Sequence, residues 1–429
     1  MLSSDTNKAH LWRKTAPARA TAPGLAGDQK ADVLVVGGGF TGLAAALGAA
    51  DAGARVMLLE GGKVGGAASG RNNGLVISHH SKAAPSEIEK AWGKTYGDRY
   101  NGLVANAAPV AFGLLQRFAI DAHQVQTGWI QPAHSAAALA RTRVFHDEWK
   151  AFGLGVEWLE RDEISDRIGS AYPGGWIVHN SGHVNPYAMA IGLANAIERL
   201  GVRIFENTRA VSITKATGGW RVATAQGSIT APEVVLATNA LTGDIWPRLH
   251  RTMIPVTLYQ AASAPLSAAL RKRILIGNPA VSDTRRDIRA FHYDRDHRIV
   301  TAGTLTSWHN AEKRGKVAAS RLLAKAFPAL GPAPQVDEYW EGTFAVVPDR
   351  KPRLFRLAPG LVFGGIYSGR GVALALSLGQ EIGLWAAGRR GDGDMPLPVT
   401  DLRTVPFQPV AVQVAKHIHP LHRLQDKLS

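Results

Sequence analysis

The chain has 429 residues, which is too long for one compact hydrophobic core and suits two. Its composition, 45% hydrophobic and 19% charged, is typical of a folded globular protein and excludes a disordered one. The absence of cysteine excludes disulfides, thiolate nucleophiles, cysteine-ligated zinc, iron–sulfur clusters and any cofactor attached through cysteine. The net charge of +15 indicates a basic surface, but no dense Lys/Arg run interleaved with aromatic residues occurs, so nucleic acid is not an expected partner.

The first segment, residues 1–30, is basic and lacks the apolar stretch of a secretory signal. We therefore expect an N-terminal extension of a cytoplasmic protein. Residues 31–50 are apolar enough to suggest a membrane span, but their glycine cluster and the flanking Asp32 and Asp51 favour a strand followed by a helix. No integral membrane segment is expected.

A dinucleotide-binding pattern follows. Residues 33–36 are wholly apolar and β-branched or leucine, as in a buried parallel strand, while 43–50 predict a small-residue helix and 55–59 a second strand. Between the first strand and the helix lies a G-x-G-x-x-G motif, formed by Gly37, Gly38, Gly39, Phe40, Thr41 and Gly42. Strand, motif, helix and second strand occur in the order that a dinucleotide site requires.

Each part of this pattern has a physical task. Gly37 permits the tight turn, Gly39 lets the backbone approach a pyrophosphate, and Gly42 allows close packing of helix on strand. The helix N-terminus then offers N–H groups and a positive dipole to the phosphates. Glu60, at the end of the second strand, can accept hydrogen bonds from ribose hydroxyls and would repel a 2′-phosphate. The motif alone leaves NAD and FAD open, and disfavours NADP.

The downstream segments favour a flavin. Residues 65–74 form a loop of small residues where a nicotinamide fold would continue with further βαβ units. Residues 233–240 predict a strand that ends in a small polar turn. Residues 360–372 predict a strand and a glycine-rich turn before a helix over 373–387, whose N-terminus suits an electron-rich carbonyl.

Several of these segments resemble the D-amino-acid-oxidase (DAO) superfamily of FAD-dependent oxidoreductases, and above all its branch of γ-glutamylputrescine oxidoreductases, near the glycine and sarcosine oxidases. The similarity lies in the N-terminal H-L-W at 10–12, A-S-G-R-N at 68–72, A-T-N-A at 237–240 and Y-S-G-R-G-V-A at 367–373. It extends over nearly the whole chain.

The resemblance implies an α/β fold (α+β overall) with a Rossmann-like FAD-binding domain and a β-sheet substrate-binding domain, of the glutathione-reductase-2-like kind. We expect a discontinuous FAD-binding domain over 31–82, 185–248 and 353–390, a substrate-binding domain over 83–184 and 249–352, and a tail over 391–429. Periodicity predicts helices over 87–96, 101–119 and 135–152, and a basic surface helix over 412–428 that breaks near Pro420.

The resemblance also implies non-covalent FAD and assigns its contacts. The residues expected to bind FAD are Gly37, Gly38, Gly39, Phe40, Thr41, Gly42, Glu60, Ser69, Gly70, Arg71, Asn72, Asn73, Val211, Ala237, Gly369, Arg370, Gly371 and Val372. Of these, the four glycines of the motif and Glu60 would hold the ADP part, and Val211 would meet the adenine through its backbone. The pyrophosphate and the ring side would be lined by Ser69, Arg71, Asn72 and Asn73. The last four residues of the list, 369–372, would lie at the pyrimidine end of the flavin ring.

Departures from the branch cluster where the substrate should lie. Arg370 stands where the branch usually has His, and His292 where it often has Arg. The guanidinium fork of Arg370 suits a carboxylate or sulfonate, so Arg370, with His292 and Tyr259, is a candidate catalytic or substrate-clamping residue. The alternatives are a structural role for Arg370 in the glycine-rich turn and ordinary sheet packing for the other two.

The neighbouring His79 and His80 would point to opposite sides of a strand, so at most one can face the flavin. Adjacent residues of this kind cannot chelate one ion, and no metal site is expected.

The function expected is oxidation of a primary or secondary amine, an amino acid or acidic amine, by hydride transfer to the flavin, with reoxidation by O2 or another acceptor. Two alternatives stay open: a dehydrogenase of a 2-hydroxy acid or polyol that passes electrons to quinone, and a flavin-holding subunit that needs a partner chain. The oligomeric state cannot be derived from the sequence.

Overall fold

A computed structural model describes residues 9–80, 82–305 and 307–417 of the chain. Its central feature is a seven-stranded sheet of order β21-β19-β20-β13-β2-β3-β9. The five strands from β20 to β9 are parallel, whereas β19 runs antiparallel to β20 and parallel to β21. The strands are β2 (Val33–Val36), β3 (Val56–Leu59), β9 (Arg203–Phe205), β13 (Glu233–Leu236), β19 (Arg353–Ala358), β20 (Leu361–Gly365) and β21 (Val399–Thr400). Since β2 and β3 are buried along their whole length, their continuous apolar sequences are explained by cover on both faces.

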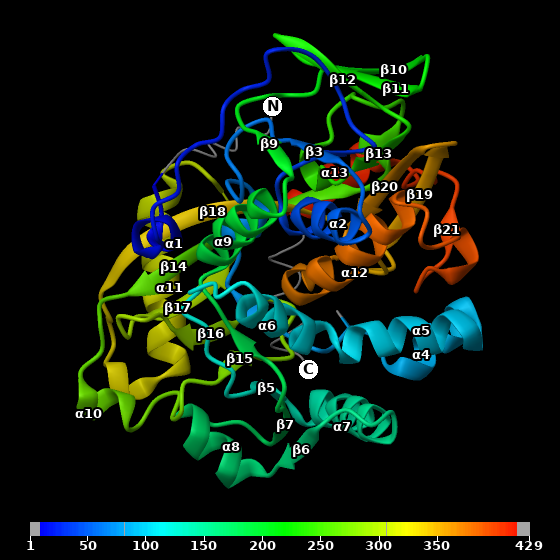
Figure 1. Cartoon of the computed structure of the whole chain (residues 1–429). Coiled ribbons are helices and arrows are strands. Elements are labelled where there is room, and N and C mark those ends of the chain that lie inside the picture. The colour runs from blue at the N-terminus through cyan, green and yellow to red at the C-terminus, as the bar shows by residue number, and fades with distance from the viewer. Residues whose placement is uncertain (1–8, 81, 306, 418–429) are drawn as a thin grey trace.

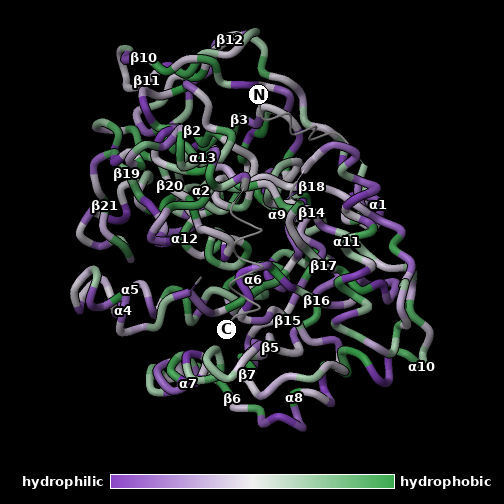
Figure 2. Tube along the Cα trace, turned by 180° about the vertical axis from the view of Figure 1, so that it is seen from behind, coloured by the Kyte–Doolittle hydropathy of each residue, from purple (hydrophilic) through white to green (hydrophobic). Residues whose placement is uncertain are grey.

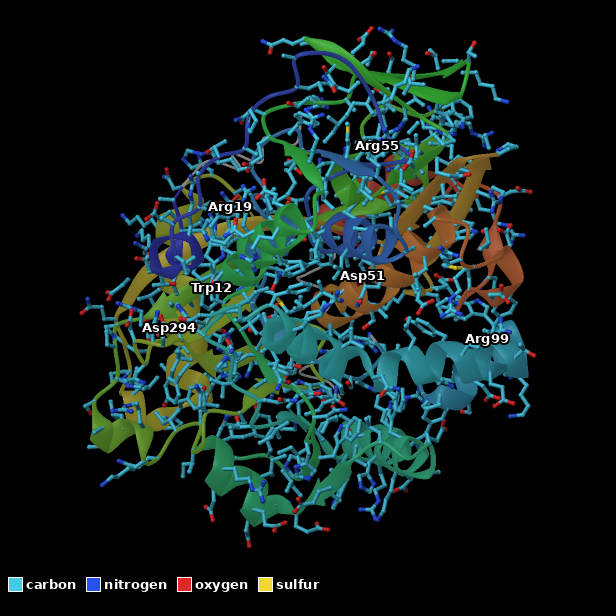
Figure 3. The ribbon with its side chains drawn as sticks, in the orientation of Figure 1. Trp12, Arg19, Asp51, Arg55, Arg99 and Asp294 are labelled. Carbon is cyan, nitrogen blue, oxygen red and sulfur yellow. The ribbon has the colours of Figure 1, made fainter. Side chains whose placement is uncertain are left out.

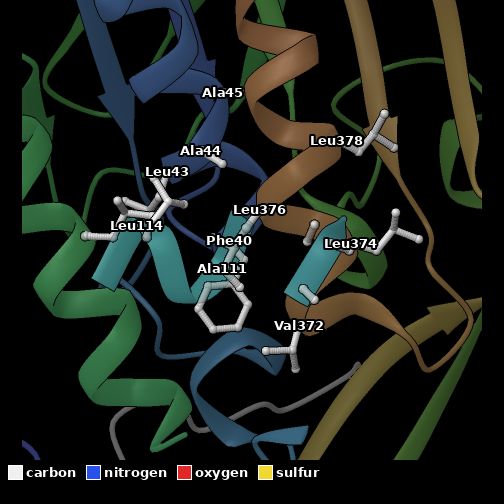
Figure 4. Close-up of a cluster of buried hydrophobic side chains, with 14 of the residues drawn as sticks. Phe40, Leu43, Ala44, Ala45, Ala111, Leu114, Val372, Leu374, Leu376 and Leu378 are labelled. Carbon is white, nitrogen blue, oxygen red and sulfur yellow. The ribbon is translucent and has the colours of Figure 1, made fainter. Parts of the chain in front are cut away.

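Two helices pack side by side against this sheet, α2 (Phe40–Asp51) and α12 (Gly371–Ala386) (Figure 1). Glycines bring them into close contact: a Cβ on Gly48 would lie 2.4 Å from the Gln380 carbonyl, and one on Gly383 would lie 2.1 Å from the Ala45 carbonyl. Apolar side chains of both helices share one cluster with α6 (Ala107–Arg117) (Figure 4), and α2 is largely hydrophobic along its length (Figure 2). The hydrophobic effect thus fixes both helix N-termini relative to the sheet.

A four-stranded sheet of order β1-β12-β11-β10 flanks the parallel sheet. Its strands are β1 (Gly27–Lys30), β10 (Ser212–Ala216), β11 (Gly219–Ala223) and β12 (Gly227–Ala231). A two-stranded sheet joins β4 (Leu75–Val76) to β8 (Gly182–His183), and α3 (Ala68–Arg71) and α9 (Pro186–Arg199) pack together nearby.

The largest sheet has eight strands, in the order β18-β14-β17-β16-β15-β5-β7-β6. They are β5 (Trp129–Pro132), β6 (Val156–Leu159), β7 (Gly175–Val178), β14 (Ile254–Ser263), β15 (Ala280–Ser282), β16 (Ala290–Tyr293), β17 (Ile299–Gly303) and β18 (Val336–Val346). Alternate residues face opposite sides. Tyr259 and Ala261 of β14 pack with α11 (Ala311–Ala326), whereas Gln260 reaches Asn73, in the loop after α3. One side of this sheet therefore faces the candidate cofactor loop and the other is covered by α11.

The remaining helices and 3-10 turns cover the edges and ends of these sheets. They are α4 (Pro85–Trp92), α5 (Lys94–Ala105), α7 (Ala136–Ala151), α8 (Arg161–Ile168), α10 (Ala268–Arg271), α13 (Gln408–His417), η1 (Asn239–Leu241), η2 (Leu249–Thr252), η3 (Pro328–Leu330) and η4 (Asp392–Asp394). The single helix expected over 101–119 is wrong, because α5 ends at Ala105 and α6 begins at Ala107, with Asn106 outside helical geometry between them. Of the helix expected over 412–428, the structure describes α13 as far as His417, and Pro420 lies outside the described residues.

The N-terminal segment contacts both the eight-stranded and the seven-stranded sheet regions, through Trp12 and Arg19 respectively (Figure 3). Its helix α1 (Leu11–Thr15) buries Leu11 and Trp12 against β14, β17 and β18. Further along, Arg19 is buried in an ion pair with Glu206 after β9, with 2.7 Å between the charged atoms. The mixed α/β fold class is confirmed, while the domain boundaries stay a prediction. Within the described ranges, no helix combines the length and the apolarity needed to cross a bilayer.

Candidate functional site

The G-x-G-x-x-G segment forms the tight turn between β2 and α2. Gly37 has φ of +116°, which favours glycine, and a Cβ on Gly42 would lie 1.8 Å from the Gly37 carbonyl oxygen. Gly39 is the N-cap of α2 and supplies no side-chain cap, so this helix end has no capping group of its own. The backbone here places the positive end of the α2 dipole at a tight glycine turn, as a pyrophosphate site needs.

Two side chains lie at this cradle. The Phe40 N–H donates to Ser69 Oγ at 2.9 Å, and a Cβ on Gly39 would lie 2.8 Å from that same oxygen. Glu60 accepts from the Gly38 N–H and the Gly62 N–H, each at 2.7 Å. Burial raises the pKa of Glu60, while these two backbone hydrogen bonds favour the carboxylate. Each carboxylate oxygen keeps a lone pair that can accept from a ribose hydroxyl.

The expected cofactor segment after α3 contains side chains with structural partners. Arg71 is buried and its Nε donates to the Gly66 carbonyl at 2.8 Å, so its guanidinium orders the loop. Asn72 donates to the carbonyls of Ala68 and Ser69, at 3.0 and 2.7 Å. Gly70 is needed for close approach, since its Cβ would lie 2.2 Å from the Gly65 carbonyl. These residues shape the loop, and the ring-facing role that the resemblance implies for Arg71 and Asn72 stays a prediction.

A second glycine-rich turn precedes α12 and is strained. Ile366, Ser368 and Gly369 have φ of +63°, +50° and +96°, and the first of these is a buried β-branched residue. Such conformations cost about 1–3 kcal/mol each for non-glycine residues and cluster at functional sites. Arg370 is the N-cap of α12 with no side-chain cap, so the Gly371 and Val372 amides begin an uncapped helix. Thr41 Oγ1 and the Tyr367 hydroxyl, 2.8 Å apart, connect this turn to α2.

Two further expected contacts lie at the ends of strands. Val211 is 57% exposed and its N–H donates to the Ala223 carbonyl, so only its own carbonyl is open to an adenine. Ala237 directly follows β13, and its carbonyl oxygen would lie 2.7 Å from a Cβ on Gly37. Both positions belong to the dinucleotide side of the molecule.

Arg370 is the cation of the candidate substrate site. Its guanidinium lies over the ring of the buried Trp129, 4.8 Å from the centroid. No hydrogen bond or ion pair of this side chain occurs within the described residues, and burial lowers its pKa to about 10. A partly buried guanidinium without a carboxylate partner is able to bind an anion. The alternative role, bonding the carbonyls of the turn through the side chain, is not what the structure shows.

The other two candidate clamp residues have contacts of their own. Tyr259 lies on the side of β14 that faces α11, stacked on Tyr339 with 6.0 Å between ring centroids. His292 is buried, with Nε2 2.7 Å from the Asn73 carbonyl and Nδ1 2.9 Å from the Tyr293 carbonyl. Both of its nitrogens therefore face backbone, and burial lowers its pKa. Tyr259 thus packs on the face of β14 that α11 covers, and both nitrogens of His292 face backbone carbonyls, while a part for these two residues in binding the substrate stays a prediction.

The adjacent histidines are not on a strand, because β4 ends at Val76. His79 Nδ1 accepts from Trp149 Nε1 at 2.8 Å, and the His79 ring contacts Trp129 at 5.5 Å. Burial, and then the charge of Arg370, hold the pKa of His79 well below its ordinary value. His80 instead contacts Asn101 Oδ1 through Nε2 at 2.7 Å. His79 is thus the histidine near Arg370, and it is neutral.

Residues 32–385 match the DAO family, described as FAD dependent oxidoreductase. The chain belongs to this family. It is 29% identical to a probable oxidoreductase OrdL of Rhizobium meliloti over 390 residues, 90% of this chain and 89% of the relative. It is also 29% identical to γ-glutamylputrescine oxidoreductase of Escherichia coli over 384 residues, 88% of this chain and 87% of the relative. The fold is similar to that of glycine oxidase from Geobacillus kaustophilus, with a TM-score of 0.71 at 20% identity, over 88% of this chain and 100% of the neighbour.

The protein is therefore an FAD-dependent oxidoreductase of the DAO family, and FAD is its expected cofactor. The residues present fit this group: they are the N-termini of α2 and α12, neither capped by its own N-cap side chain, the glycine contacts at Gly39 and Gly42, and the carboxylate of Glu60. Sequence reasoning missed Trp129, because a lone tryptophan in a short strand carries no motif. It also gave Trp12 no role beyond the resemblance.

Proposed function

We propose that this DAO-family protein oxidises a primary or secondary amine that also bears a carboxylate, an amino acid or acidic amine, with Arg370 as the residue that holds the carboxylate. The observation that carries the proposal is the guanidinium of Arg370, which lies over Trp129 without an acidic partner among the described residues. The names of the relatives and of the fold neighbour, a γ-glutamylputrescine oxidoreductase and a glycine oxidase, support an amine or amino acid as the substrate class.

When bound, FAD would supply the hydride acceptor for the α C–H of the amine, and the resulting imine would hydrolyse in water. The protein's own residues have simpler tasks. The guanidinium of Arg370 binds and orients the carboxylate through two parallel N–H donors, while Trp129 fixes the plane of the guanidinium. The uncapped N-terminus of α12 provides a positive electrostatic environment for charge that develops nearby.

No strong general base is required in this scheme, since a neutral amine reacts directly. His79, the histidine near Arg370, is neutral and its Nδ1 is already occupied by Trp149. His79 therefore adds no second positive charge to the site and does not act as a proton acceptor. O2 or another acceptor would reoxidise the cofactor.

The test is an anaerobic screen in which bleaching of the flavin absorbance reports reduction. Three matched sets are compared: carboxylate-bearing amines, the same amines without the carboxylate, and 2-hydroxy acids. The proposal expects fast bleaching by the first set only. Bleaching by hydroxy acids alone would support the dehydrogenase alternative and refute this proposal, and no bleaching by any set would favour a subunit that needs a partner chain.

A further inference from the structure

Ser282, the last residue of β15, has a hydroxyl whose hydrogen-bonding capacity is only partly used by the protein. Its Oγ accepts from Trp129 Nε1 at 2.9 Å, and no other partner of this hydroxyl occurs within the described residues. A serine hydroxyl has one O–H donor and two acceptor lone pairs. Accepting from the indole uses one lone pair, so the O–H remains able to donate to a ligand.

Strand alternation places this hydroxyl on the side of the eight-stranded sheet that faces the cofactor loop. Ser282 pairs in register with Ala290 of β16, so both residues face the same way. His292, two residues further along β16, shares that side and lies 2.7 Å from the Asn73 carbonyl. The next residue of the chain, Asp283, is buried in an ion pair on the opposite side. Ser282 itself is only half-buried, so a ligand can reach it from the cofactor-loop side.

Arg370 and Ser282 contact the same indole ring. The guanidinium of Arg370 lies over the ring of Trp129, 4.8 Å from the centroid, and the Ser282 hydroxyl lies at the Nε1 edge of that ring. A carboxylate offers about four lone-pair positions, of which a guanidinium fork takes two. The remaining positions are open to a neighbouring donor. A single side chain thus brings a cation and a neutral donor within reach of one small anion.

We propose that the Ser282 hydroxyl is a second substrate-binding group, which donates to the carboxylate held by Arg370 and adds to the selection of carboxylate-bearing amines. This inference rests on the proposed function, because Ser282 meets the carboxylate only where Arg370 holds it. The hydrogen bond from Trp129 Nε1 strengthens the donation, since a hydroxyl that accepts one hydrogen bond is polarised toward donating the next.

The test is titration of the oxidised Ser282→Ala holoenzyme with acetate, followed by the flavin absorbance. We expect the Kd to rise about tenfold, as for the loss of one hydrogen bond to a charged group. Ser282→Thr keeps a hydroxyl and should restore acetate binding to within threefold of the parent. The control is Ser320→Ala, which loses a hydroxyl bond to the Pro334 carbonyl beside α11 and should leave the Kd unchanged. Parent-like binding by Ser282→Ala, or equal losses in Ser282→Ala and Ser282→Thr, would overturn the proposal.

Two further measurements separate a direct contact from an effect transmitted through the indole ring. In the Arg370→Lys background no guanidinium plane depends on Trp129, so a direct bond should still make Ser282→Ala weaken acetate binding at least threefold. An effect that disappears in this background would overturn the direct contact. In stopped-flow flavin reduction by the fastest amine of the anaerobic screen, Ser282→Ala should raise the apparent Kd about tenfold and keep the limiting rate within threefold. A lower limiting rate with an unchanged Kd would overturn the binding role.

Failure of this inference and failure of the proposed function give different results. If Arg370→Met weakens acetate binding and Ser282→Ala does not, Arg370 holds the carboxylate alone and only the role of Ser282 is refuted. If neither variant changes acetate binding, the carboxylate is not held at Arg370, and the proposed function fails together with this inference.

Discussion

The interaction that most directly sets substrate choice in the proposed function is the one between Arg370 and a carboxylate. Arg370→Met removes the guanidinium and keeps an unbranched side chain that can still pack on Trp129. Truncating one partner of a buried, hydrogen-bonded charge pair costs about 2–5 kcal/mol. Because Arg370 is only partly buried, the lower half of that range applies, and 3 kcal/mol corresponds to roughly a 150-fold weaker binding of the carboxylate.

The assay is titration of the oxidised holoenzyme with acetate, followed by the perturbation of the flavin absorbance. Acetate carries the carboxylate without an amine, so it isolates the clamp from the chemistry. Arg370→Lys should fall between parent and Arg370→Met, since an ammonium supplies charge but no bidentate fork. Arg117→Met, which breaks a surface pair with Asp51, is the control and should bind acetate as the parent does. Binding of acetate by Arg370→Met within threefold of the parent would refute the clamp.

Three further results are expected. Acetate binding should weaken as the pH rises through about 10, where Arg370 loses its charge, whereas acetate itself stays ionised over this range. Gly42→Ala should abolish FAD retention, as its Cβ would lie 1.8 Å from a backbone carbonyl oxygen, measured as the flavin-to-protein absorbance ratio. Arg19→Met should lower the free energy of unfolding in urea by about 3 kcal/mol, because the buried Glu206 loses its cation and keeps only the N–H groups of Ala22 and Val64 as donors.

Each of these has a contrasting result that would count against it. Acetate binding that stays constant to pH 11 would mean that burial does not lower the pKa of Arg370 to about 10. Gly102→Ala adds a Cβ with no atom within 4 Å on a helix and should retain FAD fully, so equal loss in both glycine variants would point to general misfolding. The double variant Arg19→Met with Glu206→Gln should recover much of the stability that the single variant loses, because no buried charge then lacks its counter-ion. If the double variant is as unstable as the single one, the loss comes from packing.

The turn that forms the candidate cofactor site could be predicted from the sequence, because backbone geometry determines which residues it needs. Gly37 is required by its positive φ, and Gly42 because a Cβ there would lie 1.8 Å from the Gly37 carbonyl oxygen. Requirements of this kind fix the spacing of glycines in the sequence. Glu60 follows from the same spacing. The strand and helix assignments around them agree with the structure to within a few residues, since a buried parallel strand and a small-residue helix have characteristic compositions.

The substrate half was not predictable in the same way. Tyr259 and Gln260 are neighbours in sequence, yet only the latter faces the cofactor loop, and a shift of one residue in strand register would reverse them. The contact of Arg370 with Trp129 joins a helix N-cap to a strand 241 positions earlier, for which no local pattern exists. Asn106 shows the same limit for helices: the periodic pattern continues through it, although the backbone breaks there.

The cofactor turns depend on backbone geometry, whereas the candidate substrate site depends on single side chains. This difference explains why the fold resembles that of the relatives although the substrate cannot be read from the sequence. The dinucleotide cradle consists of main-chain groups at glycines that have no room for a Cβ. Most substitutions that keep these glycines therefore leave the cradle intact. The guanidinium of Arg370, by contrast, occupies the last position before α12, where a change of one side chain alters charge and reach without disturbing the turn, whose strain lies at Ile366 and Ser368. Under the proposed function, we therefore expect a single substitution at residue 370 to change the substrate preference more than it changes FAD binding. It follows that Arg370→His, which introduces the residue usual in the γ-glutamylputrescine oxidoreductase branch, should keep the flavin and weaken the preference for carboxylate-bearing amines.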